Sequence, residues 1–97
     1  AGKAQKALKE RYQVGSLLGR GAFGSGYSGT HRADGAPVAI KCVPRNRIRH
    51  WGELPNGTWA SLEIVLLDKV STRFRGVIQL LQWVELPNSF MMVMGFL

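Results

Sequence analysis

Residues 18–43 read LGRGAFGSGYSGTHRADGAPVAIKCV, and this segment determines how the rest of the chain is interpreted. Within it, Gly19–Gly24 matches G-x-G-x-x-G, a pattern in which missing side chains let backbone N–H groups approach phosphate oxygens. The match is weak support on its own, because 12 glycines among 97 residues make chance matches common. The residues that follow the loop therefore have to decide what it does.

The segment after the glycine loop predicts a strand. A dinucleotide-binding version of the pattern would need a helix that opens at its third glycine. Ser25–His31 is instead rich in glycine and β-forming residues, so the loop joins this strand to an earlier one, Tyr12–Leu18, and forms a flap suited to phosphates. Asp34-Gly35 then predicts a hairpin turn into a third strand, Pro37–Val43.

The rest of the chain predicts one helix and two further strands. Ser61 is expected to cap the helix, with Glu63 in its first turn, where the helix dipole favours a negative charge. The residues at helical spacing that form its stripe are Leu62, Val65, Leu66, Lys69 and Val70. Val77–Glu85 and Ser89–Met94 are β-like runs. We therefore predict an α+β fold, a five-stranded antiparallel sheet with one main helix.

Composition limits the classes of protein that need to be considered. The chain has 13 Lys+Arg and 6 Asp+Glu, a net charge of +7, and a length that suits one domain or part of one. Cys42 is the single cysteine and cannot form an internal disulfide, which favours a reducing compartment, the cytoplasm or the nucleus. No apolar run approaches the ~20 residues of a membrane span, so we expect no membrane partner.

The basic residues raise the possibility of nucleic-acid binding. Residues 1–11 form a basic tail or short helix, and Arg45–Trp51 carries several basic groups beside an aromatic ring. No zinc-ligand spacing, RNA-binding motif or recognition-helix pattern accompanies them. We therefore expect a solvated basic connection at residues 45–51 and no specific nucleic-acid partner.

Lys41 and Glu63 give the glycine loop a chemical context. Lys41 ends the sequence Val38-Ala39-Ile40-Lys41 on the third strand, where apolar neighbours would direct its ammonium beneath the glycine loop. Glu63 could reach that ammonium across the face of the sheet. The spacing predicts an ion pair beside a phosphate-binding flap.

This order of elements resembles the ATP-binding, amino-terminal lobe of a protein kinase. The likeness to the Pim family of serine/threonine kinases rests on six segments: Tyr12–Gly15, Leu17–Gly19, Pro37–Lys41, Trp51–Thr58, Leu62–Leu67 and Gly76–Leu81. Trp51–Gly57 is the most specific of them, because it is not a general kinase element. The resemblance implies a partial protein kinase domain over residues 12–97, following the tail at residues 1–11.

The resemblance implies transfer of phosphate from ATP to Ser or Thr of protein substrates, with Mg2+ as the metal of the full-length family. Lys41 and Glu63 would be the catalytic pair, since Lys41 would hold the α- and β-phosphates and Glu63 would fix Lys41. Leu18 and Ala39 would enclose adenine, Phe23 would cap the flap, and Met94 stands at the gatekeeper position. The implied nucleotide contacts are Leu18, Gly19, Arg20, Gly21, Ala22, Phe23, Gly24, Ser25, Gly26, Ala39, Lys41 and Met94.

Two positions depart from the family pattern. Gly26 stands where the family has a valine on adenine, and losing that partly buried side chain is expected to weaken nucleotide binding about tenfold. After Met94 the chain reads Gly95-Phe96-Leu97, whereas the family continues into a helical lobe with H-R-D and D-F-G motifs. We expect a truncated domain without metal ligands or a catalytic base, inactive as these 97 residues.

A non-catalytic interaction module is the alternative function. The core is expected to include Leu62, Leu66, Leu67, Leu80 and Leu81, with some of them facing the missing lobe. That face would be a bare apolar patch, which causes aggregation or recruits a protein partner.

Overall fold

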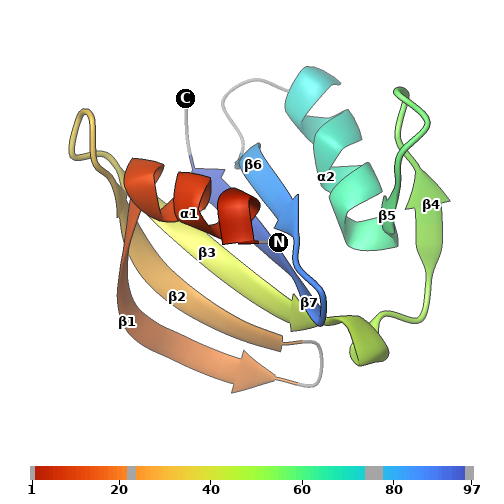
Figure 1. Ribbon diagram of the computed structural model, residues 1–97. Helices are drawn as coiled ribbons and strands as arrows, with labels where there is room; N and C mark the ends of the chain where they lie inside the picture. Colours follow the sequence, from red (N-terminus) through yellow and green to blue (C-terminus); the bar gives the residue numbers. More distant parts are fainter. Residues whose placement is uncertain (1, 22–23, 74–77, 96–97) are drawn as a thin grey trace.

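A computed structural model describes residues 2–21, 24–73 and 78–95 of the chain. Its main feature is an antiparallel sheet of five strands in the order β1–β2–β3–β7–β6 (Figure 1). The strands are β1 (Tyr12–Gly21), β2 (Gly24–His31), β3 (Pro37–Pro44), β6 (Gln79–Glu85) and β7 (Ser89–Gly95). The predicted five-stranded antiparallel sheet with one main helix is confirmed.

The remaining elements lie before β1 and between β3 and β6. They are α1 (Gly2–Arg11), the 3-10 turn η1 (Arg45–Arg47), β4 (Trp51–Glu53), β5 (Trp59–Ser61) and α2 (Leu62–Arg73). The segment before β1 is thus a helix and not an extended tail. Neither helix in the described parts of the chain has the length and apolarity needed to cross a membrane.

The small β4–β5 hairpin was not predicted from the sequence. Its strands pair antiparallel, from Trp51 opposite Ser61 to Glu53 opposite Trp59. Leu54 and Thr58 close it through a backbone hydrogen bond of 2.9 Å, and Gly57 sits in the turn with φ +87°. Each strand has only three residues, too short for the alternating pattern by which strands are recognised.

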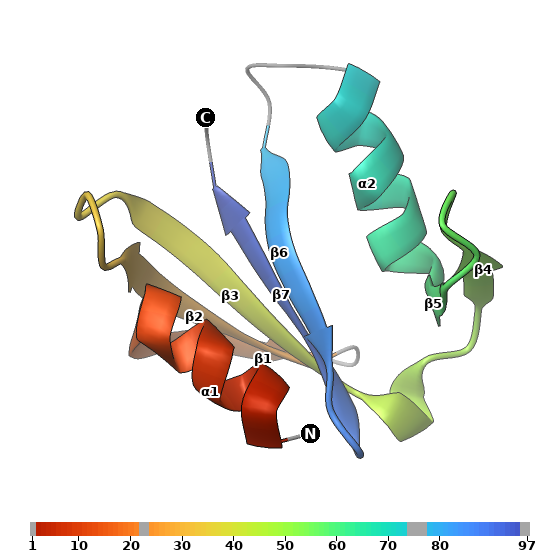
Figure 2. The same ribbon diagram turned by 45° about the horizontal axis from the view of Figure 1, so that its top comes forward.

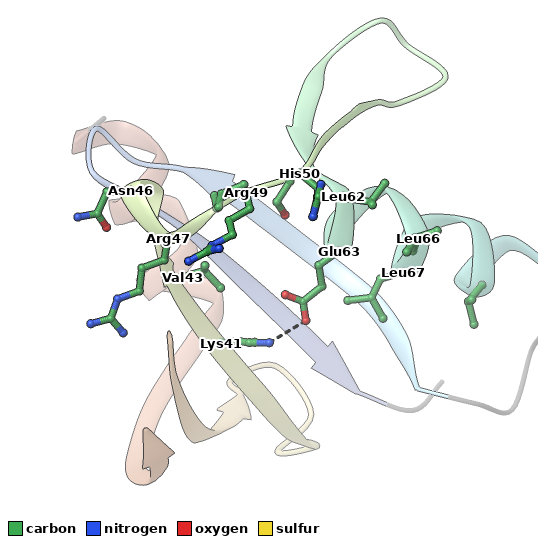
Figure 3. A pocket seen from close by; sticks show the side chains of 13 residues that line it. Lys41, Val43, Asn46, Arg47, Arg49, His50, Leu62, Glu63, Leu66 and Leu67 are labelled. Atoms are coloured by element: carbon green, nitrogen blue, oxygen red, sulfur yellow. Dashed lines mark hydrogen bonds and ion pairs between the residues drawn. The ribbon is translucent and has the colours of Figure 1, made fainter. Parts of the chain in front are cut away.

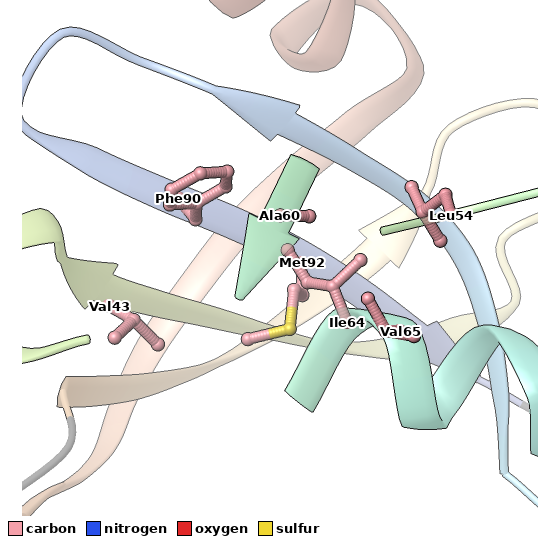
Figure 4. Close-up of a cluster of buried hydrophobic side chains, with 7 residues drawn as sticks. All are labelled: Val43, Leu54, Ala60, Ile64, Val65, Phe90 and Met92. Atoms are coloured by element: carbon pink, nitrogen blue, oxygen red, sulfur yellow. The ribbon is translucent and has the colours of Figure 1, made fainter. Parts of the chain in front are cut away.

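Opposite faces of the five-stranded sheet carry separate apolar clusters, because side chains alternate along each strand. The face toward α1 buries Leu8, Tyr12, Val38, Ile40, Val84 and Val93. The face toward α2 buries Val43, Leu54, Ala60, Ile64, Val65, Phe90 and Met92 (Figure 4). In Figure 2 the two helices lie far apart, and α2 accompanies β6 but not β1 or β2. The β1–β3 part of the α2 face therefore has no helix over it.

Helix α2 begins as predicted but turns a different side to the core. The Ser61 hydroxyl accepts a hydrogen bond from the Ile64 backbone N–H at 3.3 Å, which confirms Ser61 as the N-cap. Of the predicted stripe, Val65 is buried, whereas Leu62, Leu66 and Val70 are exposed; Ile64, which lies outside the stripe, is fully buried. The helix is apolar on more than one side, so periodicity alone could not identify its packed face.

Candidate functional site

Lys41 and Glu63 meet on the α2 face of the sheet. Lys41 lies on β3 and Glu63 in the first turn of α2, and the ammonium Nζ donates to the Glu63 carboxylate Oε2 at 2.8 Å (Figure 3). Their side chains retain 30% and 41% of their exposure, so the pair remains accessible to a ligand. A pair this exposed contributes little to stability, so its main consequence is to fix the position of a cation. The predicted contact between the two residues is present.

The glycine hairpin lies beside Lys41 in a defined register. Gly19 on β1 pairs with Gly26 on β2, and Gly26 pairs with Lys41 on β3. Residues paired across antiparallel strands share a face, so these two glycines lie on the face of the sheet that carries the Lys41 side chain. A Cβ atom added to Gly19 or Gly26 would meet no atom within 4 Å. The sheet surface leading away from Lys41 is therefore bare backbone.

Gly24 differs from the other glycines of the loop. Its φ is +139°, and a Cβ there would lie 2.2 Å from the Cys42 carbonyl oxygen of β3. Only glycine is compatible with this backbone angle and this approach. The third glycine of the pattern thus holds the hairpin against β3, while Gly19 and Gly21 have open space around them.

The other residues implied for adenine border the uncovered part of the α2 face. Ala39 is exposed and pairs with Ser28 on one side and with the half-buried Met94 on the other. Leu18 retains 68% of its exposure at the sheet edge. Arg20 pairs with Ser25. Of the remaining predicted contacts, Ala22 and Phe23 lie outside the described residues.

A groove beside the ion pair was missed by the sequence analysis. The basic connection forms one wall of it, and α2 forms the other, with Lys41 and Glu63 between them (Figure 3). The connection is exposed at every residue except the half-buried Ile48, and within it Arg45 pairs with Glu85 and lies over the rings of Trp51 and Phe90 at 5.0 and 5.5 Å. The basic residues next to an aromatic ring were the available signal, but their position opposite a helix depends on the tertiary fold.

The described residues were also searched for a metal site. Within residues 2–21, 24–73 and 78–95, no three His, Cys, Asp or Glu side chains gather as metal ligands would. Glu63, the acidic residue that lines the groove beside Lys41, is engaged with that lysine.

The chain is similar to known protein kinases. Residues 12–97 match the protein kinase domain family. The chain is 40% identical over 87 residues to serine/threonine-protein kinase prk-2 of Caenorhabditis elegans, covering 90% of this chain and 19% of that protein. It is 36% identical over 96 residues to serine/threonine-protein kinase pim-2 of Danio rerio, covering 92% of this chain and 31% of that protein.

A plant protein gives a similar result at lower identity. CBL-interacting serine/threonine-protein kinase 14 of Arabidopsis thaliana is 33% identical over 86 residues, covering 89% of this chain and 18% of that protein. The chain thus spans less than a third of the length of each of these three relatives.

Proposed function

Because the chain belongs to the protein kinase family, we propose that it is the nucleotide-binding part of a serine/threonine kinase of the Pim type. The single observation that carries this proposal is the Lys41–Glu63 pair at the inner end of the Gly19–Gly26 row. The reaction proposed for the complete enzyme is transfer of the ATP γ-phosphate to Ser or Thr of a protein.

The geometry fits a triphosphate. The ammonium of Lys41 supplies a positive charge, and Glu63 holds it in place. The two glycines paired beside it leave the backbone open to close approach by phosphate oxygens. Lys41 would hold the α- and β-phosphates, and the bare surface near Ala39 and Met94 would receive adenine. Phosphoryl transfer depends mainly on positioning and on neutralising charge, and this part of the protein would supply the positioning.

Mg2+ and the catalytic base would have to come from residues beyond these 97. The sequence contains no His-Arg-Asp or Asp-Phe-Gly triplet, the motifs from which the resemblance would draw the base and the metal ligand. We propose that the chain by itself binds nucleotide without transferring phosphate. Support for the Pim type comes from the relative named pim-2 and from the Trp51–Thr58 segment, which forms β4 and the whole turn between β4 and β5.

Thermal unfolding with and without ATP tests this proposal. ATP in excess over its dissociation constant should raise the melting temperature of the chain, because ligand binding to the folded state stabilises it. Lys41→Ala should abolish the increase, and Lys6→Ala, which removes an exposed lysine from α1 on the other face, should retain it. An equal ATP-dependent increase in both variants would contradict the assignment of Lys41.

A non-catalytic interaction module is the second candidate, and the exposed apolar residues of α2 favour it. It predicts no stabilisation by ATP in the unmodified chain. The same melting experiment therefore separates the two functions before any variant is made.

A further inference from the structure

Strand β1, which curves along one edge of the sheet (Figure 1), changes the face it presents partway along its length. Val14 pairs with Gly29 and lies on the face toward α1, where it borders a small pocket together with Leu8. Because side chains alternate along a strand, Leu17, three residues later, would be expected on the other face. It pairs instead with Tyr27, which packs against the cluster on the α1 face. The strand therefore holds an extra residue between Val14 and Leu17.

The extra residue forms a β-bulge, in which Gly15 and Ser16 together stand opposite Ser28 of β2. The Ser16 backbone N–H donates to the Ser28 hydroxyl Oγ at 2.9 Å, and that hydroxyl donates to the Ser16 carbonyl at 3.4 Å. A Cβ atom added to Gly15 would lie 2.5 Å from the same Oγ. The Ser28 side chain thus fills the bulge and replaces the strand pairing that the bulge interrupts.

The bulge decides which of two adjacent leucines faces the proposed nucleotide site. Because Leu17 lies on the face toward α1, Leu18 lies on the opposite face, followed by Gly19, which pairs with Gly26 there. A strand that slips by one residue turns every side chain to the other face. Without the bulge, Leu17 would take the place of Leu18 on the nucleotide face, about 3.3 Å farther from Gly19 along the strand.

We propose that Ser28 is a positioning residue for adenine: its hydroxyl holds the bulge, and the bulge places Leu18 on the nucleotide face. The inference rests on the proposed nucleotide site. Ser28 also pairs with Ala39, the other residue expected to enclose the base, so one residue of β2 fixes both sides of the adenine contact. Ser16 is exposed, so water can replace the hydroxyl as its partner. Removing the hydroxyl should therefore affect the position of Leu18 more than the stability of the fold.

Calorimetric titrations of the full chain with ATP and with inorganic tripolyphosphate test the proposal. Ser28→Ala should weaken ATP binding about fivefold, because part of the apolar contact between Leu18 and the base is lost. It should leave tripolyphosphate binding unchanged, because that ligand has no base. The difference between the two ligands is the decisive measurement, since a general loss of structure would weaken both. Thr30→Ala removes another hydroxyl from β2 and should leave both affinities unchanged.

A double-mutant cycle tests whether Ser28 acts through Leu18. Leu18→Ala alone should weaken ATP binding about fivefold or more, because the whole apolar contact is removed. Adding Ser28→Ala to Leu18→Ala should cause no further loss, because the bulge then has no leucine to place. Additive losses would mean that Ser28 contacts the nucleotide itself and would overturn the positioning role.

Melting temperatures test the contact within the bulge without any ligand. Gly15→Ala should lower the melting temperature, because the new Cβ meets the Ser28 hydroxyl at 2.5 Å. The same substitution should cost less in the Ser28→Ala chain, which lacks that oxygen. Gly21→Ala is the matched control, since its Cβ would meet nothing within 4 Å, and it should cost the same in both chains.

The possible outcomes separate this inference from the function on which it rests. No ATP binding by the unmodified chain would overturn the proposed function and the inference together. ATP binding that Ser28→Ala leaves unchanged would overturn the inference alone and keep the nucleotide site. Equal losses of ATP and tripolyphosphate binding in Ser28→Ala would reduce the role of Ser28 to general stability. An equal cost of Gly15→Ala in both chains would mean that the Ser28 hydroxyl does not occupy the bulge.

Discussion

The β1–β2 hairpin and the β3–β7 pair belong to one sheet but are packed very differently. In β1 only Tyr12 is buried, and no residue of β2 is. The central pair, by contrast, buries Val38, Ile40, Val43, Phe90, Met92 and Val93. The hairpin is held mainly by backbone pairing, whereas the central strands are held by side chains on both faces.

A nucleotide site needs a segment that can adjust to the ligand and a cation held in a fixed position, and the two regions meet these needs separately. Regions with few buried apolar contacts open at lower free energy than the core does, so the hairpin can adjust to a ligand. Lys41 lies on β3 beside the buried Ile40 and two residues before the buried Val43, so its position is set by the well-packed part of the sheet. The weakly packed hairpin and the well-packed strands meet at the Gly26–Lys41 pair.

The largest expected effect comes from the core side of the comparison. Phe90 is fully buried and contacts the rings of Trp51 and Trp83. Phe90→Ala should lower the free energy of unfolding by about 3–5 kcal/mol, measured by urea denaturation. Leu17→Ala in the hairpin, at a residue with 45% exposure, should cost less than about 0.5 kcal/mol. Similar losses in the two variants would mean that the hairpin is packed as tightly as the centre of the sheet.

The second prediction concerns the point where the hairpin touches the core. Gly24→Ala places a Cβ against the Cys42 carbonyl at a positive φ, so it should lower stability by about 1–3 kcal/mol. Gly19→Ala has open space at the new Cβ and should change stability by less than about 1 kcal/mol in either direction. The free energy of unfolding of each variant in urea checks this, and equal values would mean that the chain at Gly24 does not approach the Cys42 carbonyl so closely.

The third prediction concerns the surface of the hairpin beside Lys41. Gly26→Val adds an apolar side chain where a Cβ meets nothing within 4 Å. It should tighten ATP binding by up to about tenfold, since the side chain would be partly buried by the base. Calorimetric titration measures the affinity. Thr30→Val, at the other end of β2, is the control and should leave affinity unchanged. No gain for Gly26→Val would place adenine elsewhere.

The smallest expected effect lies in the turn that joins the hairpin to β3. The Ala36 backbone N–H and the His31 ring, which contact the Asp34 carboxylate at 3.0 and 2.8 Å, hold the pKa of Asp34 below its ordinary value of 3.8. A lowered folded-state pKa means that these contacts stabilise the turn above about pH 3.8 and are lost as pH falls through the folded pKa. An NMR titration should give a midpoint below 3.8 for Asp34. A midpoint at or above that value would mean that the contacts do not form in solution.

Much of the fold could be predicted because local chemistry and tertiary structure agree. Asp34-Gly35 predicted a turn, and Gly35 adopts a φ of +73° there. The Lys41–Glu63 contact could be predicted from a strand with a single lysine and a helix with a single early carboxylate. The turn and the ion pair could both be predicted because few other residue types could take these roles: glycine favours a positive φ, and a lysine pairs with a carboxylate.

The groove and the packed side of α2 could not be predicted in the same way. Leu62 and Ile64 are both apolar, and only the placement of the β4–β5 hairpin and β7 decides that Ile64 is the buried one. Glycines 19, 21, 24 and 26 cannot be told apart in the sequence, but of these four only Gly24 has no room for a Cβ atom. Such differences arise from contacts between segments distant in sequence.

Helix α1 has a practical consequence for choosing where to begin the chain in experiments. The match to the kinase family begins at residue 12, yet Leu8 of α1 is buried at 2% exposure, and the helix contacts both β1 and β6. A chain that begins at residue 12 would lack α1 and would expose Val84 and Val93, which pack in one cluster with Leu8. Poor solubility of such a shortened chain would then result from the exposed apolar cluster and would not indicate a defect in the nucleotide site.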